Sequence, residues 1–102
     1  MNILIDSPAG RNRDIYFPEG ALKKLKNLGN VILNNTTAPF SESDMEKHII
    51  NVDICITHWD TPVFSDTVIR NADKLKLIAH AAGSVANLVS ENVYRRGIIV
   101  RM

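Results

Sequence analysis

The sequence predicts a single α/β domain in which helices cover both faces of a parallel sheet. Five short apolar segments alternate with four helical patterns along the chain, and this alternation is typical of strands joined by helical crossovers. The middle apolar segment, residues 53–57 (DICIT), is apolar on both alternating faces, as expected for a central strand between two helical layers. With 102 residues, 45% of them hydrophobic and 23% charged, the chain can bury a core of its own.

The first half of the chain supplies two strands and two helices. In chain order, the expected elements are a strand at 2–6, a helix at 18–28, a strand at 30–33 and a helix at 41–49. The turn cluster Ser7–Gly10 closes the first strand, and Gly29 ends the first helix. Leu22, Leu25 and Leu28 recur at helical spacing, so we expect them to face the core.

The second half supplies three strands and two helices. In chain order, the expected elements are a strand at 53–57, a helix starting at Thr61–Pro62 or Ser65–Asp66, a strand at 77–80, a helix at 87–96 and a strand at 98–100. Cys55, the only cysteine, lies between two isoleucines and is expected to be a small buried hydrophobe. Gly97 stops the last helix, so the sequence ends on a strand.

Right-handed crossovers make the flavodoxin-like strand order 2-1-3-4-5 the simplest three-layer arrangement for these elements. In that order the first and fifth helices share one face of the sheet, and here the closing fifth helix is lacking. One face is therefore expected to be half covered, at a cost of about 25 cal/mol per Å² of exposed apolar surface. Either another part of a longer chain or a second copy is expected to cover it.

Composition excludes several classes of partner. The net charge is +1, with intermixed signs and no long basic run, so neither a nucleic-acid footprint nor a polybasic membrane patch is expected. The N-terminus lacks the basic start and apolar stretch of a signal peptide, and no apolar run approaches membrane-spanning length. These features favour a cytoplasmic protein with a small-molecule partner.

Ligands of open parallel sheets bind at the carboxyl ends of the strands, which directs attention to the loops starting at Ser7, His58 and Ala81. The loop at 81–85 has small side chains, and successive amides ahead of a helix can hold a carboxylate. The alternative is a tight connection whose small residues only permit close packing. Trp59 could flank a small ligand or cap the edge of the core.

The histidines and arginines leave further alternatives open. His80 could polarise a ligand, share a metal with His58 or bond a backbone carbonyl, and the last is favoured. His48 is expected to be structural or solvated, and no zinc-ligand spacing is present, so no metal is expected. Arg11 and Arg13 flank no Walker or GxGxxG motif, so they are expected to be solvated and no nucleotide site is supported.

Residues 75–89 (LKLIAHAAGSVANLV), continuing to 95–100 (RRGIIV), closely resemble the N-terminal segment of the catalytic domain of D-isomer-specific 2-hydroxyacid dehydrogenases. That family commonly shows LKLIxxxGxGxDNID followed by RGIxV. Residues 52–59 and the segments at 61–63 and 68–69 resemble the preceding strand and helix of the family. Ser84 and Ala86 depart from the common glycine and aspartate, as in a divergent branch with an AHAAGSV loop.

The resemblance implies a substrate site. It places the substrate carboxylate on the backbone amides of Gly83 and Ser84, with Ala82 and Val85 alongside. Trp59 matches a substrate-contacting position that is often arginine in the family, which implies a less charged substrate tail.

The resemblance also implies a division of labour. The family interconverts a D-2-hydroxy acid and a 2-keto acid with NAD or NADP, and it needs a GxGxxG domain plus an arginine, a glutamate and a histidine that lie beyond the matched segment. Residues 1–102 are therefore expected to be a single substrate-domain fragment of a homo-oligomeric, homodimeric enzyme. The chain alone is expected to be inactive, with neither catalytic nor cofactor-binding residues. The alternative is a free-standing, non-catalytic small-molecule-binding or dimerisation module.

Overall fold

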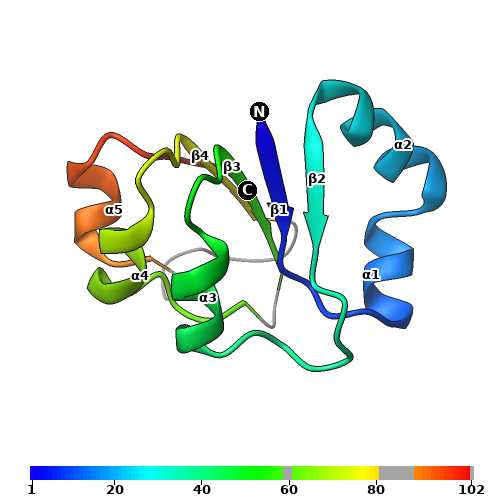
Figure 1. Ribbon diagram of the computed structural model, residues 1–102, viewed down its shortest axis with the longest axis horizontal. Helices are drawn as coiled ribbons and strands as arrows, with labels where there is room; N and C mark the ends of the chain where they lie inside the picture. Colours follow the sequence, from blue (N-terminus) through cyan, green and yellow to red (C-terminus); the bar gives the residue numbers. More distant parts are fainter. Residues whose placement is uncertain (59–60, 81–88, 102) are drawn as a thin grey trace.

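The computed structural model describes residues 1–58, 61–80 and 89–101. Five strands form one parallel sheet in the order β2-β1-β3-β4-β5, which confirms the predicted flavodoxin-like topology (Figure 1). Their bounds are β1 Asn2–Ile5, β2 Asn30–Leu33, β3 Ile54–Thr57, β4 Leu77–His80 and β5 Ile99–Arg101. Each strand is three or four residues long, and the fully buried strand residues lie in β1, β3 and β4.

Helices lie on both sides of the sheet. Their bounds are α1 Arg11–Tyr16, α2 Glu19–Leu28, α3 Glu42–His48, α4 Asp66–Asn71 and α5 Glu91–Arg95. Figure 1 shows α3, α4 and α5 on one side of the sheet and α1 and α2 on the other. Ser41 caps α3 in a reciprocal capping box with Asp44, and the Ser65 hydroxyl caps α4 by accepting from the amide of Val68.

The main core lies between the sheet and the layer formed by α3, α4 and α5. Leu4, Cys55 and Ile78 occupy one row across β1, β3 and β4, and all three are fully buried. They belong to one cluster with residues of the helical layer, among them Met45, Ile49, Phe64, Val68 and Val93. Cys55 is thus a buried apolar residue, as predicted.

In the described part of the chain, helices cover the opposite face of the sheet at one end only. In the row formed by Ile3, Ile54, Leu77 and Ile99, the exposed fraction rises from 1% at Ile3, through intermediate values, to 51% at Ile99. Helices α1 and α2 lie on the side of β1 and β2, and among the described residues no helix follows β5 (Figure 1). The predicted half-covered face is therefore present, over β3, β4 and β5.

Three local expectations were wrong. Residues 11–16, expected as loop, form α1, which ends before Pro18 because a residue preceding proline disfavours helix. Leu28, expected inside, is the last residue of α2 and is 69% exposed, while Leu22 and Leu25 are half-buried. Val89 was placed in a helix starting at Asn87, but it forms a parallel bridge with Phe64, and α5 begins only after Ser90.

Candidate functional site

The buried polar side chains of the described residues gather at one edge of the sheet. They are Asp6, Ser7, Asn34, Thr57, His58 and His80. Each one ends a strand or lies within two residues of its carboxyl end, from β1 through β4. Burying polar groups costs free energy unless they are hydrogen-bonded, so such a concentration at the ligand-binding edge of a parallel sheet indicates a site.

Thr57 and His80 connect the ends of β3 and β4. They are register partners, and the Thr57 Oγ1 lies 2.7 Å from the His80 Nδ1. Burial lowers the pKa of His80 below its ordinary value of 6.5, and the neighbouring His58 lowers it further. The partner described for the His80 Nδ1 is thus a hydroxyl, where a backbone carbonyl was the favoured expectation, because the parallel register places the Thr57 side chain within reach.

The depressed pKa of His80 makes stability depend on pH. The folded protein holds His80 neutral, so below pH 6.5 the unfolded chain binds more protons than the folded one. We expect the contribution of neutral His80 to the free energy of unfolding to be complete above pH 6.5. This contribution should decrease as the pH falls toward the pKa of His80 in the folded protein. Urea denaturation at a series of pH values measures this slope.

The matched variants for this experiment are His80→Asn and His48→Asn. His80→Asn removes the titrating group while keeping polar atoms near Thr57, so the slope between pH 5 and 6.5 should become shallower, as about one titrating group is lost. His48 is exposed and stacks on Phe40 with ring centroids 4.4 Å apart, so His48→Asn is the control for replacing a histidine outside the polar cluster. Equal slopes for wild type and His80→Asn would contradict the assignment.

Asp6, His58 and Thr61 connect the ends of β1 and β3. The His58 amide donates to the Thr61 Oγ1 over 2.9 Å, and the Thr61 hydroxyl donates to the Asp6 Oδ1 over 2.9 Å. The Thr61 amide also donates to the His58 carbonyl over 3.1 Å. The segment that follows β3 is therefore joined to the end of the neighbouring strand by side chains as well as by the sheet.

Arg13 and Asn34 organise the ends of β1 and β2. The Arg13 guanidinium donates to the carbonyls of Asn34 over 2.6 Å and of Ser7 over 3.4 Å, so the expectation of a solvated Arg13 was wrong. The Asn34 amide donates to the carbonyls of Asp6 and Ala38. Among the described residues no hydrogen-bond partner reaches the buried Ser7 Oγ, which leaves this hydroxyl as a candidate ligand contact.

The residues predicted to contact substrate lie outside the described residues: Trp59, Ala82, Gly83, Ser84 and Val85. Their described neighbours His58 and His80 lie side by side in the polar cluster, at the ends of adjacent strands. Sequence reasoning missed Asn34 and the Asp6 to Thr61 link. A polar residue directly after an apolar strand was the available signal for both Asp6 and Asn34.

The described residues offer no metal site and no activated thiol. No group of three histidine, cysteine, aspartate or glutamate side chains in the described ranges is arranged to hold a metal ion. Burial, and secondarily the charge of Asp6, raises the pKa of the Cys55 thiol, so Cys55 is not a nucleophile near neutral pH. In the described part of the chain, no helix has the length and apolar character needed to cross a membrane.

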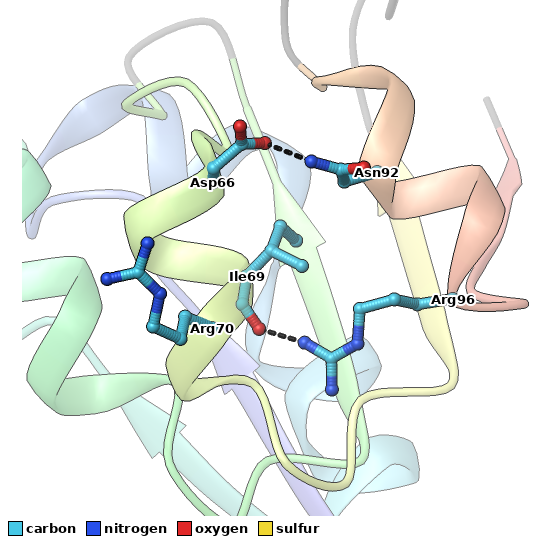
Figure 2. A pocket seen from close by; sticks show the side chains of 5 residues that line it. All are labelled: Asp66, Ile69, Arg70, Asn92 and Arg96. Carbon is cyan, nitrogen blue, oxygen red and sulfur yellow. Dashed lines mark hydrogen bonds between the residues drawn. The ribbon is translucent and has the colours of Figure 1, made fainter.

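Away from the polar cluster, a hollow of about 470 Å³ lies between α4 and α5 (Figure 2). Its polar groups already bond one another: Asp66 accepts from Asn92 over 2.8 Å, and Arg96 donates to the carbonyls of Ile69 and Ala72 at the end of α4. Figure 2 shows Arg70 directed away from α5. This hollow is a seam between two helices and lacks a converging set of available polar groups.

Comparison with solved structures finds proteins that share this fold over nearly the whole chain. The chain superposes on the TT0316 protein of Thermus thermophilus with a TM-score of 0.78 and 21% identity, covering 98% of this chain and 29% of that one. It also matches NAD+-bound 3-phosphoglycerate dehydrogenase of Entamoeba histolytica with a TM-score of 0.70 and 20% identity, covering 100% and 32%. Salmonella D-lactate dehydrogenase matches with a TM-score of 0.67 and 14% identity, covering 100% and 30%.

The chain therefore has the fold of roughly the three tenths of these proteins that it covers. At these identities the likeness concerns the fold. A scan against protein-family models found no match, and a search of curated proteins found none either.

Proposed function

We propose that this chain is the N-terminal part of the substrate-binding domain of an NAD(P)-dependent dehydrogenase that interconverts a D-2-hydroxy acid and a 2-keto acid. The observation that carries the proposal is the cluster of buried polar side chains at the carboxyl ends of β1 to β4. The 81–85 loop, whose sequence resembles the substrate-carboxylate loop of that family, follows β4 and so begins at this edge. Two proteins of the same fold are named as 3-phosphoglycerate and D-lactate dehydrogenases, which supports this reaction class.

In this proposal the chain binds and orients the substrate. The amides of Gly83 and Ser84, flanked by Ala82 and Val85, hold the carboxylate, and Trp59 borders the substrate tail. NAD or NADP supplies or accepts the hydride when bound to a separate nucleotide-binding domain. The catalytic acid/base and the carboxylate-orienting arginine belong to the rest of the enzyme, so residues 1–102 form one domain that is inactive by itself.

The test of substrate binding is a titration of the chain with pyruvate, followed by the amide signals in two-dimensional NMR. We expect saturable shifts at Gly83 and Ser84, because a bound carboxylate accepts hydrogen bonds from their amides. Propionate, which has a carboxylate but no keto group, is the matched control and should bind more weakly. Shifts scattered over the surface, or none at 82–85, would contradict the proposal.

A companion prediction concerns the cofactor. We expect no saturable NADH binding to the isolated chain, because it contains no GxGxxG turn and no other phosphate-binding motif. NADH fluorescence titration measures this directly. Saturable micromolar binding would show that this chain itself binds the cofactor. It would overturn the proposal that substrate and cofactor are bound by separate domains.

A second candidate function is a free-standing small-molecule-binding or dimerisation module. The half-covered face over β3 to β5 favours it, because a second copy would bury that apolar surface and the net charge of +1 opposes association little. The DNA downstream of the Met102 codon distinguishes the two candidates. An open frame leading to GxGxxG supports the enzyme, and a stop codon supports the module. Both candidates are proposed to be cytoplasmic and to form homo-oligomers.

A further inference from the structure

Asp6 is a buried residue with a carboxyl side chain at the carboxyl end of β1. It follows β1 directly, between β2 and β3, and only 2% of its surface is exposed. The backbone there is fixed by the sheet, since the Asp6 amide faces the Ile56 carbonyl at 3.4 Å. A buried carboxylate needs polar partners to offset the lost hydration, and one partner of the Asp6 side chain is the hydroxyl of Thr61, 55 residues away in sequence.

Thr61 links this carboxylate to the chain after β3, and the direction of its hydrogen bonds is fixed. The Thr61 Oγ1 accepts from the His58 amide over 2.9 Å, so its single proton is directed to the Asp6 Oδ1, also over 2.9 Å. The Thr61 amide donates to the His58 carbonyl over 3.1 Å. Both ends of the short segment from His58 to Thr61 are thereby joined to each other and anchored on β1.

We infer that Asp6 is a positioning residue for this segment, which carries Trp59 in the sequence. The inference rests on the proposed function insofar as Trp59 borders the substrate there. Asp6 acts through Thr61, whose hydroxyl donates to the Asp6 carboxyl group over 2.9 Å, and Asp6 directly follows a strand in the interior of the sheet. The two described ends of the segment, His58 and Thr61, are thus held to β1, and a change at Asp6 reaches the substrate edge without contacting substrate.

The first test needs no ligand, because Trp59 is the only tryptophan of the chain. Acrylamide quenching of its fluorescence reports how freely the segment moves. Thr61→Val keeps the shape but removes the hydroxyl, and we expect it to raise the quenching rate constant roughly twofold, since local freedom increases when an anchoring contact is lost. Thr61→Ser keeps the hydroxyl and should restore the wild-type value. Thr67→Val, at an exposed threonine of α4, is the matched control.

A double variant shows whether Asp6 and Thr61 act as one unit. Asp6→Asn should raise quenching in the same direction, and Asp6→Asn combined with Thr61→Val should add nothing beyond Thr61→Val alone. Far-ultraviolet circular dichroism identifies any variant that fails to fold. If Thr61→Val does not fold, the quenching of Thr61→Ser is compared with that of the wild type. Additive effects, unchanged quenching in folded Thr61→Val, or a Thr61→Ser value equal to that of Thr61→Val would overturn the inference.

A titration with pyruvate, read by Trp59 fluorescence, separates this inference from the proposed function. If the wild-type fluorescence responds and Thr61→Val needs about tenfold more pyruvate for the same response, the positioning inference and the proposed function are both supported, because loosened positioning weakens binding. If wild type does not respond, the substrate assignment fails, while the positioning role is still decided by the quenching results. A wild-type response that Thr61→Val reproduces at the same concentrations would overturn the link between Asp6 and substrate.

Discussion

Replacing Phe64 by alanine is expected to lower the free energy of unfolding by about 3–5 kcal/mol, the usual cost of truncating a buried aromatic residue to alanine. Phe64 is fully buried in the core cluster under α3, α4 and α5. It also lies in the bridge to Val89, where its carbonyl accepts from the Ser90 amide over 3.2 Å. A cavity here therefore opens the main core beside the connection that leads into α5.

Urea denaturation followed by circular dichroism measures this loss. Val63→Ala is the matched control, because Val63 is the preceding residue and is 51% exposed. Its cost should stay within about 0.5 kcal/mol, as for other surface substitutions. A Phe64→Ala protein as stable as Val63→Ala would mean that the core is not organised around this ring.

Replacing Ile99 by lysine is expected to convert a self-associating chain into a monomer. Ile99 is the most exposed residue of the row Ile3, Ile54, Leu77 and Ile99, at the uncovered end of that face. A second copy covering this face would bury Ile99. The lysine would then leave an unpaired charge in the interface, at about 3–5 kcal/mol, so the dissociation constant should rise by at least roughly a hundredfold.

Sedimentation-equilibrium analysis at micromolar concentrations measures the association. Ile50→Lys is the matched control, because Ile50 is similarly exposed, at 49%, but follows α3 on the other side of the sheet. It should leave the dissociation constant unchanged. A wild-type chain that is monomeric at all concentrations would contradict self-association through this face, and an equal effect of both lysines would place the interface elsewhere.

The strands could be predicted from the sequence because each is a continuous apolar run ended by a turn or polar residue. Residues 30–33 and 77–80 match β2 and β4 without correction. Helix α1 could not be predicted in this way. It has six residues and no side-chain cap, so neither periodicity nor capping marks it. The bridge at Val89 was also missed, because it depends on a distant partner, Phe64.

The location of the candidate site followed from topology, whereas its internal bonds did not. Parallel strands place the residues after β1, β3 and β4 at one edge, so Ser7 and His58 could be identified from sequence. The contacts of His80 with Thr57 and of Asp6 with Thr61 join residues 23 and 55 positions apart. Those contacts depend on strand register to within one residue, and hydrophobic patterning does not fix register across a parallel sheet so closely.

The burial of Cys55 has a consequence for measuring the motions of this protein. Its thiol lies on β3, at the middle of the sheet, fully buried and held in the protonated form. An alkylating reagent reaches it only when the central strands separate, so the labelling rate reports the frequency of that opening. Since the chain has no other cysteine, one introduced on the surface would react far sooner and could carry a fluorescent label without interference from Cys55.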